Sequence, residues 1–268
     1  MKLRYITCSD PREFNDIHDI VKLGKLSPRV EIAVQAHPSK MSSGMPRNEW
    51  FRELLQYVVT DKHDIRLAVH VNREWCDEIC RTGKIPTELQ GFFNLYRGDN
   101  AYNAVIKRWQ LNMPKDTAKN INIDALKKLM AAYPEKYFIF QYNENTHDAI
   151  YKLHDSGAHF SVLYDASGGR GISPRSWNAP LFSHVPQGYS GGLSPENIAD
   201  ALDCINGVAK RAVANMDEND QTVYRMDGRN DIWIDAEGRL KTSDMFDIAR
   251  ARQYILNAEE WLAKQNQK

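Results

Sequence analysis

The sequence predicts a (β/α)8 barrel, an α/β fold, in a single domain, and three observations lead to this class. Short apolar or alternating runs recur along the 268 residues, and segments with helical spacing lie between them. This alternation predicts a parallel sheet, and about eight repeats in roughly 250 residues favour a closed barrel. The main rival is a doubly wound open sheet, but its G-x-G-x-x-G fingerprint does not follow the first run. We therefore expect one domain over residues 1–268.

The strand candidates are runs in which Val, Ile, Phe and Tyr are frequent, as they are in β-strands. The first and the last run are supported mainly by their neighbours. Since polar breaks separate each run from the next helical segment, every run is expected to add one parallel strand. The runs are residues 3–8, 30–36, 65–71, 105–111, 137–142, 159–164, 183–189 and 221–226.

The segments between the runs have the spacing of amphipathic helices. In one of them Trp50, Leu54 and Val58 recur at four-residue intervals, which places them on one helix face. Ser194 followed by Pro195 is typical of a helix start, with Ser as the N-cap and Pro in the first position. Further helical spacing is found at residues 123–130, 147–153, 198–213 and 243–262.

One connection is longer than the others. Residues 82–103, between the third and fourth strand candidates, are expected to form an inserted loop or a lid.

Composition excludes several classes of protein. The chain has 35 basic and 35 acidic side chains, so it has no broad field for a nucleic acid or an anionic membrane. No run approaches the ~20 apolar residues that span a bilayer, and no apolar segment like that of a signal peptide follows Met1. Four cysteines in a chain of this length do not form a disulfide scaffold. We expect a cytoplasmic monomer or homodimer with reduced thiols and no nucleic-acid or membrane partner.

Glycines in the loops after three strand candidates indicate where a ligand would bind. Functional residues of such barrels follow the C-terminal ends of the strands, and glycine lets backbone N–H groups approach a ligand closely. Gly191 and Gly192 lead directly into the helix start at Ser194, and a helix N-terminus favours a phosphate. Gly228 follows the last strand candidate. We expect a phosphate or another anion here; the alternative is that these glycines only make tight turns.

Several of these segments resemble the phosphoribosylanthranilate isomerases, a family of tryptophan biosynthesis. Residues 188–197, Gly-Tyr-Ser-Gly-Gly-Leu-Ser-Pro-Glu-Asn, are similar to the family's seventh strand and the loop after it. Residues 163–171 are similar to its sixth strand and glycine loop. Weaker matches occur in the family's order along almost the whole chain, at Cys8 and at residues 46–47, 70–72 and 110–112.

The resemblance implies an isomerase that converts a phosphorylated aminoaldose into an aminoketose, with a small phosphorylated substrate and no cofactor or metal. Cys8 would be the general base and Asp165 the general acid. Such a base needs some thiolate character, and such an acid needs partial desolvation. Arg47 would face the anthranilate carboxylate. The phosphate would bind the backbone N–H groups of Gly191, Gly192 and Gly228.

The chain departs from the family's pattern at several positions of the expected site, including Ser9 for Gly and Ile172 for Lys, and three further departures bear on the substrate. Arg170 stands where Thr is usual and is expected to contact an anion. Asn112 replaces a His and is expected to contact the substrate. Asp227 stands where Ser is usual, and its carboxylate would repel a phosphate at close range.

Two other functions remain open at this point. A non-catalytic barrel would keep the glycine loops and arginines to bind a phosphorylated or nucleotide-like ligand. A metal-dependent hydrolase is suggested only by His37 and His70, which follow or end two strand candidates. Cys76 and Cys80 lack the nearby partners of a zinc site and are expected to pack in the core.

Overall fold

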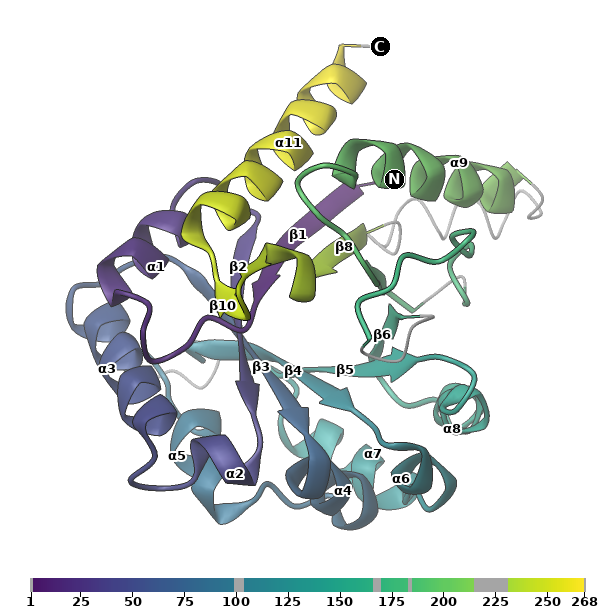
Figure 1. The fold of residues 1–268 in the computed structure, drawn as a ribbon. Coiled ribbons are helices and arrows are strands. Elements are labelled where there is room, and N and C mark those ends of the chain that lie inside the picture. Colours follow the sequence, from purple (N-terminus) through teal and green to yellow (C-terminus); the bar gives the residue numbers. More distant parts are fainter. Residues whose placement is uncertain (1, 99–103, 166–169, 183–184, 215–230, 268) are drawn as a thin grey trace.

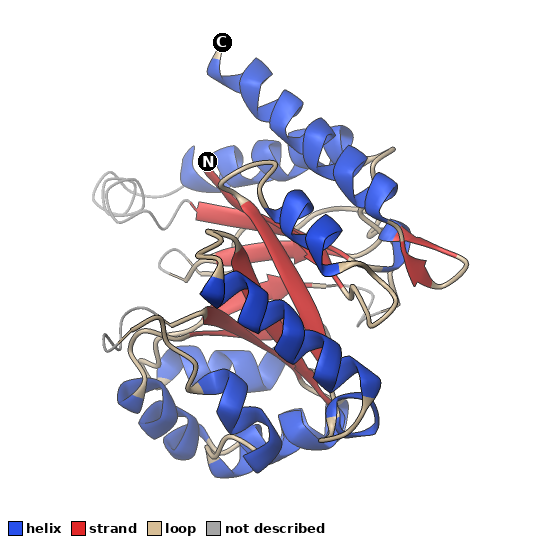
Figure 2. Cartoon of the chain, turned by 90° about the vertical axis from the view of Figure 1, so that its left-hand side faces the viewer, coloured by secondary structure: helices blue, strands red, loops and turns tan. Residues whose placement is uncertain are grey.

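Eight parallel strands close into a barrel in the order of the chain, and β1 pairs with β8 to complete it. The computed structural model describes residues 2–98, 104–165, 170–182, 185–214 and 231–267. In Figures 1 and 2 the strands lie inside and most helices pack around them. The (β/α)8 fold class is therefore confirmed. The barrel strands are β1 (Lys2–Ser9), β2 (Val30–Ala36), β3 (Arg66–Asn72), β4 (Ile106–Asn112), β5 (Tyr137–Tyr142), β6 (Ser161–Tyr164), β7 (Gln187–Ser190) and β8 (Asp231–Ala236).

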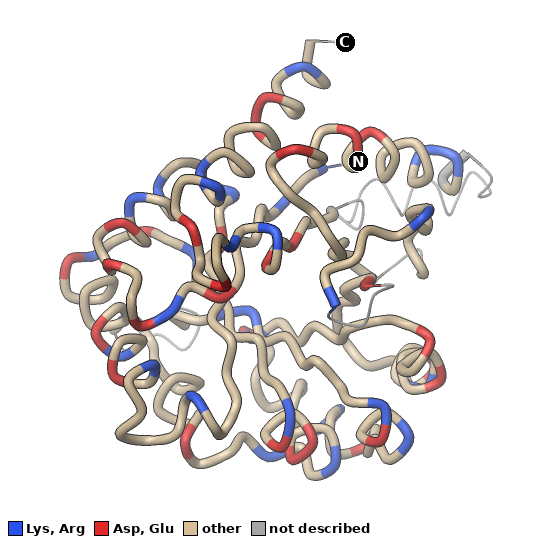
Figure 3. Tube along the Cα trace, in the orientation of Figure 1, with Lys and Arg blue, Asp and Glu red and all other residues tan. Residues whose placement is uncertain are grey.

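The helices pack their apolar faces on the outside of the barrel, where Val, Leu, Ile and Phe side chains form one large core. Basic and acidic residues are interspersed over the outer helices in Figure 3. None of the helices within the described ranges is both long and apolar enough to cross a membrane. The helices are α1 (Ile17–Gly24), α2 (Pro38–Met41), α3 (Pro46–Thr60), α4 (Arg73–Thr82), α5 (Thr87–Phe93), α6 (Lys115–Lys119), α7 (Ile123–Ala132), α8 (His147–Asp155), α9 (Ile198–Ala214) and α11 (Ile248–Asn266).

The expected strand bounds agree with the structure for β2 and β5 and differ by a few residues for most of the others. The eighth strand was predicted in the wrong place. The barrel is closed by β8, whereas residues 221–226 lie outside the described part of the chain. In β8 Asp231 and Asp235 flank Ile232, Trp233 and Ile234, so the strand has an unbroken apolar run of only three residues. A short hairpin, β9 (Lys241–Thr242) and β10 (Met245–Phe246), follows it.

The helix expected to start at Ser194 begins later. Helix α9 begins at Ile198, and the Asn197 side chain accepts a hydrogen bond from the Ser194 N–H over 2.8 Å.

The connection at residues 82–103 contains α5, whose Phe93 ring lies 4.9 Å from the ring of Trp109. Arg97 of the same connection lines a cavity at the N-terminal ends of the strands.

The indole ring of Trp233 lies in the interior of the barrel. Trp233 packs with Ile139 and Leu163 in a small interior cluster, separate from the core under the helices. Gly188 on the neighbouring strand β7 leaves the space for this ring, because a Cβ built there would lie 2.1 Å from a ring atom of Trp233. Glycine at position 188 is therefore required by the volume of the indole.

Gly188→Ala is expected to lower the free energy of unfolding by about 1–3 kcal/mol, because an added methyl group overpacks the barrel centre. Urea unfolding measures the change. Gly91→Ala is the matched control, since a Cβ at Gly91 in α5 meets only the Arg52 guanidinium at 4.0 Å. Alanine also favours a helix more than glycine does, so the control should be neutral or stabilising. Equal stability of Gly188→Ala and wild type would contradict the packing of Trp233.

Candidate functional site

The C-terminal ends of the strands surround two adjoining cavities. The deeper cavity has a volume of about 140 Å³ and lies over the end of the barrel, and the wider one, about 460 Å³, lies towards the loops after β1 to β4. They share Gln35, Asn112, Gln141 and Glu237 as lining residues. Together they form the mouth of the barrel, which is where ligands bind in this fold.

Two buried carboxyl groups line the deeper cavity. Asp165 directly follows β6, and the Gln141 side-chain amide donates a hydrogen bond of 2.7 Å to its Oδ2. Asp235 lies on β8, and the Ser9 hydroxyl donates a hydrogen bond of 2.5 Å to its Oδ1. Two carboxyl groups in one cavity can act as an acid and a base when one is protonated and the other is ionised.

Burial raises the pKa of Asp235 to about 7. The hydrogen bond from Ser9 and the charge of Arg108 act in the opposite direction, while the nearby Glu237 and Asp165 charges add to the increase. A carboxyl group with this pKa exists in both forms at neutral pH, which suits a general acid or base. The sequence prediction missed Asp235 because β8 was expected elsewhere.

Arginines and glycines form the rim of the deeper cavity. Arg170 and Arg239 both line it, together with Gly191 and Gly192. These two glycines have φ angles of 108° and 63°, a backbone conformation that favours glycine. A Cβ at Gly192 would also lie 2.4 Å from the Ser173 hydroxyl. Arg170, Gly191 and Gly192 therefore reach the mouth as the sequence led us to expect, while their contact with an anion stays a prediction.

The loop after the eighth strand differs from the expected one. Gly228 and Asp227 lie outside the described residues, and the residues that follow β8 are Glu237, Gly238 and Arg239. All three line the deeper cavity. The expected repulsion between Asp227 and a phosphate depended on placing the eighth strand at residues 221–226. In the described loop after β8, the residue with a carboxylate is Glu237.

A chain of side-chain amides covers one side of the mouth. The Gln35 amide donates to Glu237 over 2.7 Å, and its own oxygen accepts from Asn72 over 2.5 Å. Asn112 donates to Asn72 over 3.0 Å and accepts from Gln110 over 2.9 Å. Because Gln35, Asn72 and Asn112 each donate one of these hydrogen bonds and accept another, the chain fixes the orientation of their amide groups. Asn112, an expected substrate contact, lines both cavities as part of this chain.

A neutral imidazole lies next to this chain. Burial lowers the pKa of His70 to about 4, so the ring carries no charge at pH 7. Its Nδ1 lies 3.5 Å from the Gln110 amide nitrogen, and the ring lines the deeper cavity. His70 can therefore exchange hydrogen bonds with a ligand without adding charge.

Asp10 holds three cationic side chains at the edge of the wider cavity. It adopts a left-handed φ of 71° after β1 and lies 2.5 Å from Arg12, 3.2 Å from Arg47 and 2.8 Å from Lys241. Burial opposes ionisation, but the hydrogen bonds and charges of these side chains hold the pKa of Asp10 below its ordinary value. Arg47 is buried and also pairs with Glu13 at 3.4 Å. It lines the wider cavity, so its position agrees with the expected substrate contact, which is still a prediction.

Cys8 lies away from both cavities. On β1 the side chains of Thr7 and Ser9 contact Glu31 and Asp235 inside the barrel, so the alternation of a strand turns Cys8 towards the helices. The thiol is fully buried in the core, and burial and the charge of Asp235 raise its pKa. The structure therefore does not bring Cys8 and Asp165 together across one cavity, and a thiol held protonated in the core is not placed to act as a base.

The remaining histidines and cysteines form no metal centre in the described part of the chain, where no three His, Cys, Asp or Glu side chains gather as metal ligands would. His37 lines the wider cavity and His70 the deeper one. Cys76 and Cys80 are buried in α4, with their sulfur atoms 3.9 Å apart. Their expected packing role is confirmed by this burial.

Comparison with known proteins finds a similarity in fold and no match in sequence. No family model matches the sequence, and no curated protein matches it. A phosphoribosylanthranilate isomerase in complex with reduced 1-(o-carboxyphenylamino)-1-deoxyribulose 5-phosphate superimposes with a TM-score of 0.51. The two chains are 11% identical, and the match covers 97% of this chain and 100% of that one. The chain has the fold of this enzyme.

Two further structures of the same kind are similar at a lower score. The phosphoribosylanthranilate isomerase of Thermococcus kodakaraensis is 8% identical with a TM-score of 0.46, covering 95% of this chain and 98% of its own. That of Pyrococcus furiosus is 11% identical with a TM-score of 0.45, covering 96% and 98%. At sequence identities this low, the similarity is evidence of a common barrel fold and not of a common activity.

Proposed function

We propose that the chain is an enzyme that isomerises a small phosphorylated sugar by acid–base chemistry at the mouth of the barrel. The observation that carries this proposal is the pair Asp165 and Asp235. Both are buried, both line the deeper cavity, and burial raises the pKa of Asp235 to about 7. The likeness in fold to phosphoribosylanthranilate isomerases and the resemblance of the loop at residues 188–197 support the same class of reaction.

An aldose–ketose rearrangement begins with two proton transfers, and the two carboxyl groups divide them. An acid protonates the ring oxygen so that the sugar ring opens to the imine, and a base then removes the proton from C2. The aminoketose forms when C1 takes up a proton and the C2 hydroxyl group loses its own. Asp235 takes the role of the acid, because a large fraction of it is protonated at neutral pH. Asp165 takes the role of the base, which the resemblance assigned to Cys8. The neutral His70 and the amides of Gln110 and Gln141 bind the sugar hydroxyl groups.

The rim of the deeper cavity is the proposed phosphate site. Arg170 and Arg239 supply two guanidinium groups, and guanidinium matches the geometry of phosphate oxygens well. Gly191, Gly192 and Gly238 bring their main chain to the same rim. Arg47 and its neighbours in the wider cavity then face the other end of the substrate.

Turnover of phosphoribosylanthranilate, followed by the loss of its anthranilate fluorescence, tests this proposal. Wild type is expected to consume the compound, and Asp165→Asn to reduce kcat about 10²–10⁴-fold, the usual contribution of a general acid or base. Cys8→Ala is the matched control and should keep most of the activity, because the thiol lies outside both cavities. Activity lost in Cys8→Ala but kept in Asp165→Asn would overturn the assignment of the base.

A non-catalytic binding protein is the second candidate, and the position of Cys8 favours it. The residue that the resemblance assigned as base is turned into the core, while the arginines and glycines of the rim remain at the mouth. This candidate predicts that ribose 5-phosphate raises the melting temperature of a protein with no turnover. Loss of that shift in Arg239→Glu would place the binding at the rim.

A further inference from the structure

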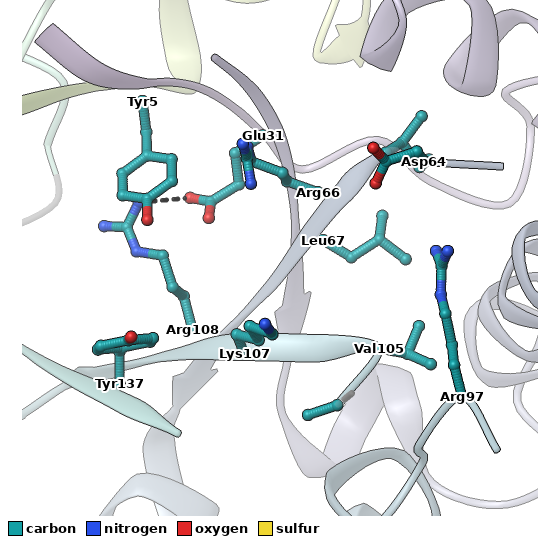
Figure 4. A pocket seen from close by; sticks show the side chains of 12 residues that line it. Tyr5, Glu31, Asp64, Arg66, Leu67, Arg97, Val105, Lys107, Arg108 and Tyr137 are labelled. Atoms are coloured by element: carbon teal, nitrogen blue, oxygen red, sulfur yellow. Dashed lines mark hydrogen bonds and ion pairs between the residues drawn. The ribbon is translucent and has the colours of Figure 1, made fainter. Parts of the chain in front are cut away.

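A separate cavity of about 230 Å³ opens at the opposite end of the barrel, among the N-terminal ends of β1 to β5. Figure 4 shows the side chains of Tyr5, Glu31 and Arg108 together on one side of it, with Asp64 and Arg97 on the other. In barrels of this class the N-terminal face contributes to stability, and the chemistry takes place at the other end. A charged cavity at this face therefore lies apart from the two cavities of the acid–base site.

A buried guanidinium group lies at the inner end of this cavity. Arg108 is buried, its Nη1 lies 3.0 Å from Oε1 of Glu31, and the Thr7 hydroxyl donates to the same oxygen over 2.9 Å. The guanidinium carbon also lies 4.2 Å from the ring centroid of Tyr5 and 4.4 Å from that of Trp233. The charges of Arg108 and Glu31 balance each other, and the contacts hold the guanidinium group in one orientation.

The outer part of the cavity carries an excess of positive charge. Arg66, Arg97 and Lys107 line it against the single carboxylate of Asp64. Arg66 donates its Nε–H to the Pro28 carbonyl over 2.7 Å, and Arg97 donates from Nη2 to the His63 carbonyl over 2.7 Å. Backbone carbonyls thus hold both side chains in place without neutralising them. Within the described ranges no ion pair is formed by Lys107.

We propose that this cavity binds a small dianion, a phosphate monoester with a short organic group. The two negative charges of a dianion balance the excess positive charge of Arg66, Arg97 and Lys107 over Asp64, whereas a ligand with a single carboxylate leaves part of this positive charge uncompensated. Tyr5, Leu67 and Tyr137 give the cavity an apolar and aromatic wall for the organic group. The volume equals that of about seven or eight water molecules, which accommodates a phosphate with a small substituent. The site is separate from the mouth, and the proposal does not depend on the proposed isomerase activity.

Isothermal titration calorimetry with phenyl phosphate at low ionic strength tests the proposal. The double variant Arg97→Glu/Lys107→Glu reverses the charge at the N-terminal face and leaves the buried Arg108–Glu31 pair intact. Arg239→Glu changes the mouth instead. Lys152→Glu, at an exposed position of α8 that lines neither end of the barrel, is the matched control. Thermal unfolding of each variant shows that it is folded.

The double variant is expected to bind phenyl phosphate at the N-terminal face at least tenfold more weakly than wild type, whereas Arg239→Glu and Lys152→Glu keep that binding. Binding should also weaken as salt is added, because the cationic side chains at the rim are partly exposed. Binding by the double variant equal to that of wild type would overturn the proposal. So would loss of all binding in Arg239→Glu, or no binding by wild type. Since turnover is not measured, none of these outcomes overturns the isomerase proposal.

Discussion

Asp235→Asn is expected to reduce turnover at least a hundredfold and, at the same time, to stabilise the fold above pH 7. Asparagine keeps the shape of the side chain and can still accept the hydrogen bond from Ser9, but it cannot transfer a proton. The loss in rate follows from the usual contribution of general acid catalysis. Both effects are measured on one purified variant, by steady-state kinetics and by thermal unfolding.

The gain in stability has a defined sign and pH range. Asp235 has an ordinary pKa of 3.8 and a pKa of about 7 in the fold, so the folded chain keeps a proton that the unfolded chain has lost. The free energy of unfolding therefore falls as pH rises from about 4 to 7. Asparagine removes this dependence, and the variant should exceed wild type at pH 8 by up to about 4 kcal/mol. At pH 4 the difference should disappear.

Asp200→Asn is the control for both effects. Asp200 is exposed on α9 and lines neither cavity at the mouth. This variant should have the activity of wild type and a small, pH-independent change in melting temperature. A fall in stability of Asp235→Asn at pH 8 would contradict the buried, titrating carboxyl group.

Arg108→Met is expected to lower the free energy of unfolding by about 3–5 kcal/mol, because it leaves the Glu31 carboxylate buried without its cation. The same substitution also removes the guanidinium contacts with Tyr5 and Trp233 at the barrel centre. Urea unfolding at neutral pH measures the loss.

A double-mutant cycle separates the ion pair from the packing. Glu31→Gln/Arg108→Met carries no buried charge at these positions, so it should be more stable than Arg108→Met alone. The cycle compares wild type, the two single variants and the double variant under the same conditions. Equal stabilities of Arg108→Met and the double variant would show that the charge of Glu31 is not what destabilises the single variant.

The strands that the sequence located best are those buried on both faces. Residues 30–36 and 137–142 are mostly apolar and aromatic, with Glu31, Gln35 and Gln141 as the polar exceptions, which is close to how a buried parallel strand appears in sequence. Strand β8 has an unbroken apolar stretch of only three residues, Ile232 to Ile234, because Asp231 and Asp235 interrupt it on either side. The misplaced strand explains both the missed Asp235 and the expectation about Gly228.

The direction of each side chain was harder to predict than the strand itself. Most residues of the barrel strands are buried, whether they face the interior or the helices, so burial alone does not distinguish the inward face from the outward face. Cys8 and Ser9 are adjacent, and the register of β1 against its neighbours turns Ser9 inward. Asp165, Gly191 and Gly192 were easier, because residues just past a strand end reach the mouth whichever face the strand presents.

The titration of Asp235 can be measured without knowledge of the substrate, so it examines the acid–base role of this carboxyl group by itself. The side-chain carboxyl carbons are followed by ¹³C NMR from pH 4 to 9, and comparison with Asp235→Asn assigns the signal. We expect an apparent pKa of about 7 for Asp235. A titration near pH 4, the ordinary range of an aspartate, would contradict an acid–base role for this carboxyl group.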